Sequence, residues 1–107
     1  MYQNSKQIFE EKIAAKLKQE PNKAKAINAV VVFHITGGSD WTMDCTKEPA
    51  EVKAGGVAGA KVEVTMSEED FVKLANGALN PQMAFLGGKL KVKGDMGLAI
   101  KLGQILT

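Results

Sequence analysis

The chain has 107 residues, which we interpret as one domain over residues 1–107, large enough to bury a core without disulfides, and its single cysteine cannot form an internal bridge. All fourteen basic residues are lysines and the formal net charge is only +2, which disfavours a nucleic-acid partner because arginine supplies the paired hydrogen bonds that read guanine and phosphate. No apolar run is long enough to span a bilayer, and the charged first residues predict no secretory signal.

The first half of the chain predicts one helix followed by three strands. Residues 5–19 place three large apolar side chains on one face among charged ones, which is typical of an amphipathic helix, and Pro21 predicts its end. Residues 27–36 are rich in β-branched side chains and predict a central strand that is buried on both faces. Residues 41–46 alternate apolar and polar side chains and predict a hairpin partner, and residues 49–54 predict an edge strand.

The second half predicts a glycine-rich crossing at residues 55–60 and a strand at 61–66. Two helices follow at 67–77 and 81–86, then a strand at 89–93 and a final helix at 95–106. Ser67, Asn80 and Asp95 stand at the three helix starts, where their side chains can accept hydrogen bonds from the first amides. This order of elements favours an α/β domain with one sheet.

The final helix has more apolar surface than one core requires. At about 100° per residue, its apolar side chains from Met96 to Leu106 cover roughly 220°, whereas about 100° is enough for a helix that packs on one core. Five methionines and only 6% aromatic residues favour an adaptable interior, because methionine is common on surfaces that bind varied partners. Each of Met43, Met66 and Met83, taken alone, can equally be ordinary core.

Residues 76–102 read NGALNPQMAFLGGKLKVKGDMGLAIKL. The succession of Asn-Pro-Gln, Ala-Phe, Gly-Lys-Leu-Lys and Met-Gly-Leu-Ala, followed by Lys-Leu, closely resembles the signature of the sterol carrier protein type-two family, the non-specific lipid-transfer domains. A looser likeness extends back through Trp41 and Asp44. The resemblance implies an α/β (α+β) fold with a single five-stranded, mostly antiparallel sheet and about five helices packed on one side. It also implies an apolar tunnel for fatty acids, fatty acyl-CoA, phospholipids or sterols, with no catalytic residue and no cofactor.

We expect the residues of such a lipid site to come mainly from the three helices of the second half, with two from the sheet. The expected lining comprises Phe33, Trp41, Phe71, Leu74, Met83, Phe85, Leu86, Met96, Ile100, Leu102, Ile105 and Leu106. Burying about fifteen methylenes at roughly 0.8 kcal/mol each offsets the cost of association, so binding would be reversible. A site held by burial alone also discriminates weakly between chain lengths.

Lysines dominate the C-terminal part of the chain. Lys89, Lys91 and Lys93 alternate along one predicted strand and therefore project from one face, and Lys101 follows in the last helix. These four side chains either form a solvated surface or contact an anionic membrane or a lipid head group, an attraction of about 1 kcal/mol per lysine.

His34 and Cys45 are the remaining candidates for chemistry. A thiol beside an imidazole can perform acyl transfer, but Cys45 alternates onto the buried face of its strand and no third orienting group is evident. One histidine and one cysteine also cannot supply the usual set of zinc ligands. We therefore expect no catalytic residue and no metal site.

The compartment and the partners follow from the resemblance alone. Many relatives end in a Ser-Lys-Leu-like peroxisomal address, which the end of this sequence lacks, so we expect an intracellular protein that is peroxisomal by resemblance only and otherwise cytoplasmic. We expect a monomer or a domain of a larger protein that binds lipid and contacts membranes transiently. Two alternatives stay open: a domain that presents lipid substrates within a multifunctional enzyme, and a protein-interaction module that uses the apolar final helix.

Overall fold

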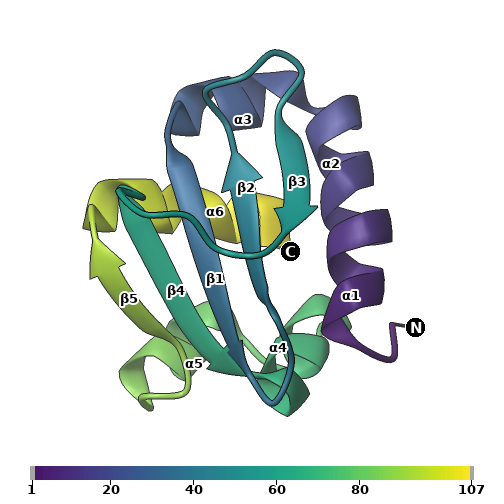
Figure 1. Cartoon of the computed structure of the whole chain (residues 1–107). Coiled ribbons are helices and arrows are strands. Elements are labelled where there is room, and N and C mark those ends of the chain that lie inside the picture. Colours follow the sequence, from purple (N-terminus) through teal and green to yellow (C-terminus); the bar gives the residue numbers. More distant parts are fainter. Residues whose placement is uncertain (1, 107) are drawn as a thin grey trace.

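The computed structural model describes residues 2–106 as one sheet with helices behind it and along one edge (Figure 1). The elements in chain order are α1 (Ser5–Gln7), η1 (Ile8–Ile13), α2 (Ala14–Gln19), α3 (Pro21–Ile27), β1 (Val30–Thr36), β2 (Asp40–Asp44), β3 (Glu51–Ala54), β4 (Val62–Ser67), α4 (Glu68–Ala75), α5 (Pro81–Leu86), β5 (Lys91–Gly94) and α6 (Met96–Leu106).

The sheet has five strands in the order β3-β2-β1-β4-β5. Strands β1 and β4 pair in parallel, with Val31 opposite Val62, and the other three pairs are antiparallel. The prediction of a mostly antiparallel five-stranded sheet is therefore confirmed. The parallel pair exists because the chain leaves β3 at one edge, crosses the sheet and enters β4 beyond β1, as Figure 1 shows in front of the strands.

The crossing also explains why one outer-face residue of β1 is buried. Gly55 and Gly59 turn the chain at φ +95° and +79°, a backbone region that favours glycine, and the Thr42 hydroxyl donates to the Gly55 carbonyl at 2.6 Å. Val32 beneath the crossing is 1% exposed. The prediction that β1 is buried on both faces is otherwise wrong, because His34 is only half-buried.

The N-terminal helix is a continuous run of α1, η1 and α2, and its middle part, Ile8–Ile13, has the wider π-helical winding. The sequence prediction missed α3: Pro21 ends one helix and occupies the first turn of the next, a position where its missing amide hydrogen is not needed. Asn28 then adopts a left-handed conformation and ends α3. The predicted strand start at residue 27 is therefore wrong, since β1 begins at Val30.

Three side chains begin the later helices as predicted. Ser67, Asn80 and Asp95 accept hydrogen bonds from amides of the first turns of α4, α5 and α6, at 3.1, 2.8 and 3.1 Å. A further contact joins the two ends of the fold: the Ser5 hydroxyl donates to the Glu68 carboxylate at 2.6 Å, which fixes the start of α1 beside α4.

One apolar core lies between the inner face of the sheet and the helices. Phe9 is at its centre and is fully buried. Its ring stacks on Trp41 and Phe71, at centroid distances of 4.9 and 5.1 Å, and meets Phe33 edge-on at 5.1 Å. Such ring pairs contribute about 0.5–1.5 kcal/mol each beyond simple burial, so the N-terminal helix is held firmly against the sheet.

Candidate functional site

Helix α6 divides into a buried face and an exposed one. Leu102, Ile105 and Leu106 are at most 5% exposed and belong to the core. On the other side, Met96 is 44% and Ile100 is 76% exposed. The helix therefore carries the surplus of apolar surface that its sequence predicts, and part of this surplus faces outward.

Helix α5 shows the same imbalance more strongly. Of its apolar side chains only Ala84 is fully buried. Met83, Phe85 and Leu86 are 66%, 43% and 79% exposed. Short surface helices normally keep such large side chains in contact with the core, so this exposure marks α5 and α6 as surfaces that an apolar ligand or partner can cover.

The twelve residues expected to line a lipid site thus fall into two sets. The exposed set comprises Met83, Phe85, Leu86, Met96 and Ile100. The buried set comprises Phe33, Trp41, Phe71, Leu74, Leu102, Ile105 and Leu106. The structure brings the buried set together in one core cluster, whereas the exposed set lies on the two helices that precede and follow β5 in the chain.

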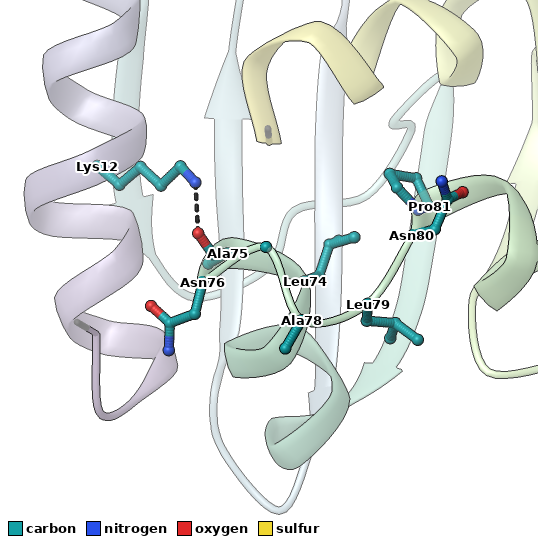
Figure 2. A pocket seen from close by; sticks show the side chains of 9 residues that line it. Lys12, Leu74, Ala75, Asn76, Ala78, Leu79, Asn80 and Pro81 are labelled. Atoms are coloured by element: carbon teal, nitrogen blue, oxygen red, sulfur yellow. Dashed lines mark hydrogen bonds between the residues drawn. The ribbon is translucent and has the colours of Figure 1, made fainter.

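A hollow of about 640 Å³ opens beside the core between the N-terminal helix and the segment that joins α4 to α5. Its walls are formed by Lys12, Leu74, Ala75, Asn76, Gly77, Ala78, Leu79, Asn80 and Pro81. Figure 2 shows that α6 passes above this segment and that the Leu74 side chain points toward α6. The volume falls within the range of about 300–1,000 Å³ that is usual for small-ligand sites.

Lys12 is the charged side chain of this hollow. Its Nζ donates to the Ala75 carbonyl oxygen at 2.6 Å, and its pKa is lowered by burial and, to a lesser degree, by the nearby charge of Lys16. None of the nine lining residues is acidic. Sequence reasoning missed Lys12 because its spacing places it on the polar face of an amphipathic helix, and no local pattern indicates what lies opposite it.

The opposite wall of the hollow is fixed by the chain's first residues. The Asn76 side chain accepts a hydrogen bond from the Tyr2 amide and donates one to the Tyr2 carbonyl oxygen, both at 2.9 Å. The Lys12 ammonium also lies 5.8 Å from the centre of the Tyr2 ring. The turn after α4 is therefore held in place by three hydrogen bonds from the N-terminal region, two with Tyr2 and one with Lys12.

A second hollow, of about 480 Å³, lies between the N-terminal helix and the edge strand β3. Phe9, Leu17 and Trp41 are among its apolar lining residues, and Lys18 also lines it. Two of these residues, Phe9 and Trp41, stack on each other within the aromatic cluster.

Lys91 and Lys93 are exposed on the edge strand β5, and Val92 between them is half-buried against the core, as the alternation predicts. The predicted strand start at residue 89 is wrong, because β5 begins at Lys91; Lys89 is exposed in the turn before it. Lys101 lies apart from these lysines on α6, where its Nζ donates to the Ala26 carbonyl oxygen at 3.2 Å.

The structure separates the two candidates for nucleophilic chemistry. The Cys45 amide donates to the Ala29 carbonyl oxygen, whereas His34 is paired with Asp40 at the other end of the same two strands. Five residues of strand correspond to roughly 16 Å. Burial raises the pKa of the Cys45 thiol to about 11, and His34 bonds Asp40 and Glu63 through its two ring nitrogens. The pair therefore cannot act together in acyl transfer.

Residues 2–106 contain no group of three or more His, Cys, Asp or Glu side chains arranged to hold a metal ion. In the same range, no helix has both the length and the apolar character needed to cross a membrane.

The fold and the apolar helices define a lipid-carrier type of domain: a mixed five-stranded sheet whose last helices keep large apolar side chains exposed. Residues 9–107 match the sequence model of the SCP-2 sterol transfer family. The chain belongs to this family, as the signature at residues 76–102 indicates.

Two curated relatives and one solved structure show the range of similar proteins. Hydroxysteroid dehydrogenase-like protein 2 of Pongo abelii is 42% identical over 86 residues, which cover 78% of this chain and 21% of the relative. Peroxisomal multifunctional enzyme A of Dictyostelium discoideum is 40% identical over 86 residues, or 77% of this chain and 20% of the enzyme. The solution structure of palmitated SCP2L2 from Aedes aegypti superposes with a TM-score of 0.80 at 26% identity and covers 97% of this chain and 95% of that one.

The chain therefore spans about a fifth of the length of these two curated relatives. In contrast, it matches nearly the full length of the palmitated insect protein. The matching segment is therefore a small part of the two curated relatives and nearly the whole of the solved chain.

Proposed function

We propose that this domain binds the acyl chain of a lipid between α6 and the α4–α5 segment and carries or presents it to other molecules. The observation that carries this proposal is the exposure of five large apolar side chains on α5 and α6. The palmitate-bound relative of the same fold supports a fatty acid or its ester as ligand. The wider range of expected ligands comprises fatty acids, fatty acyl-CoA, phospholipids and sterols.

The exposed set gives a physical reason for ligand binding. Covering one large apolar side chain completely stabilises a complex by about 1.5–3 kcal/mol, and Met83, Leu86 and Ile100 are each more than 60% exposed. An acyl chain laid along α5 and α6 would cover them and continue toward Leu74 in the hollow. Because the contacts are apolar, the same surface would accept chains of several lengths.

The matched pair Ile100→Asp and Val57→Asp tests this proposal. Both residues are exposed, at 76% and 44%, but Val57 lies on the crossing over the outer face of the sheet. Ile100→Asp should reduce binding of a fluorescent fatty acid at least tenfold, whereas Val57→Asp should bind like wild type. Equal binding by both variants would contradict a site on α6. Leu102→Asp is a poor test, because Leu102 is 2% exposed and a buried charge would unfold the domain.

Native mass spectrometry of the purified domain separates lipid binding from protein binding. A co-purifying fatty acid or phospholipid would support the carrier. A ligand-free dimer whose interface covers α5 and α6 would instead support the protein-interaction module.

We further propose that Lys89, Lys91 and Lys93 attract the domain to anionic membranes during loading. The exposure of Lys91 and Lys93 on the edge strand, and of Lys89 in the turn before it, supports this role. Replacing Lys91 and Lys93 with glutamine should weaken sedimentation with phosphatidylserine vesicles at low salt and leave weak binding to neutral vesicles unchanged. Unaltered sedimentation would leave these lysines as a solvated surface. Lys101 is the less suitable head-group contact, because its ammonium already bonds a backbone carbonyl.

The lengths of the relatives support a second function, as a substrate-presenting domain of a multifunctional enzyme. The matching segment is only about a fifth of the two relatives, and one of them is a peroxisomal multifunctional enzyme by name. We therefore propose a peroxisomal location for any longer protein that contains this domain. Sequencing the coding region on both sides of the segment, followed by localisation of the tagged full-length protein, tests both points.

A further inference from the structure

The hollow beside Lys12 has the charge pattern of a site for an anion. Lys12 is the cation among its nine lining residues, and none of the nine carries a carboxylate. In the part of the chain that the structure describes, Lys12 takes part in none of the salt bridges, although its neighbours along the helix, such as Lys16, pair with Glu20. A partly buried ammonium without a carboxylate partner favours an anionic ligand.

The Lys12 ammonium also has capacity for a further partner. It donates to the Ala75 carbonyl oxygen at 2.6 Å and lies over the Tyr2 ring at 5.8 Å. An ammonium group has three N–H donors, so the bond to Ala75 occupies one of them. The remaining donors can reach a ligand atom in the hollow.

The position of the ammonium is fixed by the core. Phe9 and Ile13, on either side of Lys12 in η1, are fully buried, and the bond to Ala75 directs the side chain across to the end of α4. A charged group held by such packing is pre-organised, which lowers the cost of binding.

The hollow also adjoins apolar surface on one side. Leu74 lines it and is itself a member of the core cluster that contains Leu102 and Leu106 of α6. Figure 2 shows Lys12 at one end of the α4–α5 segment and Pro81, the start of α5, at the other. A ligand with a charged head and an apolar tail would fit this arrangement with its head at Lys12 and its tail toward α5.

We propose that Lys12 binds the carboxylate of a free fatty acid in this hollow, while the acyl chain passes Leu74 and Leu79 toward Pro81 and the exposed side chains of α5. This inference rests on the proposed lipid-binding function and adds to it a preference for ionised over neutral lipids. The neutral wall residues of the hollow supply no competing charge.

Two ligands and two variants test the assignment. Palmitate and hexadecanol have the same chain length and differ in the charge of the head. Lys12→Met keeps the length of the side chain and removes its charge, and Lys6→Met is the matched control, because Lys6 is exposed on the same helix and outside the hollow. Binding is measured by displacement of a fluorescent fatty acid.

Lys12→Met should weaken palmitate binding about tenfold, as expected for the loss of one charge-assisted hydrogen bond, and should change hexadecanol binding less than twofold. Lys6→Met should change neither, and Lys12→Arg should retain the preference for palmitate. Equal losses for both ligands, or no loss for palmitate, would overturn the assignment of Lys12 while the proposed function stands. If the wild-type domain binds neither ligand, both proposals fail.

A measurement on the wild-type domain covers the case in which Lys12→Met does not fold. Nuclear Overhauser contacts between the Lys12 side chain and the first methylenes of labelled palmitate would support the site. Contacts between those methylenes and Lys18 at the second hollow, without any to Lys12, would overturn it.

Discussion

The division of α6 into two faces predicts opposite behaviour for neighbouring positions. Leu102 is 2% exposed and Ile100 is 76% exposed on the same helix. Leu102→Ala creates a cavity and should lower the free energy of unfolding by about 2–5 kcal/mol. Ile100→Ala removes only solvated atoms and should change it by about 0.5 kcal/mol or less.

Lipid binding should reveal a contribution of Ile100 that the ligand-free domain does not show. Palmitate at about a hundred times its Kd stabilises the wild type by about 2.7 kcal/mol. If Ile100→Ala weakens binding about tenfold, the same concentration stabilises that variant by only about 1.4 kcal/mol. Ile100 would then matter little for the empty domain and clearly for the loaded one.

Urea denaturation followed by circular dichroism, with and without palmitate, measures both quantities. For a domain of this size, each kcal/mol also corresponds to roughly 4–8 °C in Tm. A large loss of stability in ligand-free Ile100→Ala would place Ile100 in the core and refute the two-faced helix. Equal stabilisation of Ile100→Ala and wild type by palmitate would remove α6 from the lipid site.

Three further predictions concern contacts outside the hollow. Glu68→Ala should lower the free energy of unfolding by about 1–3 kcal/mol, because it leaves buried donors of α1 unpaired; a urea midpoint equal to wild type would contradict this. The Glu63 and Asp40 carboxylates, which accept hydrogen bonds from the His34 ring, raise the pKa of His34. This histidine therefore contributes stability that is complete below its unfolded pKa of about 6.5 and is lost as pH rises through the higher folded value, so Tm should fall over that range in wild type and not in His34→Gln. The Cys45 thiol, with its pKa raised to about 11, should react with a thiol reagent at neutral pH only after unfolding, and rapid labelling of the native domain would refute its burial.

Local patterns were sufficient for much of this fold. The capping residues Ser67, Asn80 and Asp95 mark helix starts through a chemistry that depends only on nearby atoms, and each makes the expected bond. The apolar surplus of α6 is also visible in the sequence, because it requires only the helical period. Helix α3 was missed because Pro21 is read as an end signal, although proline suits a first turn equally well.

The candidate site was harder to predict, because it depends on packing between distant segments. Periodicity places Leu102 and Ile100 on one broad apolar face, but contact with α3 and the sheet buries the first and leaves the second exposed. Lys12 reads as a solvated lysine, and only the fold brings it to Ala75, 63 positions later in the chain. The lining of the site thus remains a prediction that binding experiments must test.

The stacking of Phe9 against Phe71, together with the burial of Ile105 in the same cluster, has a consequence for synthesis of the chain. Because both ends contribute to one interior, a nascent chain on the ribosome cannot complete that interior until α6 has emerged from the exit tunnel. Until then the apolar side chains of the nascent chain stay accessible to chaperones. A fragment shortened at either end should therefore fold inefficiently and be cleaved readily by proteases.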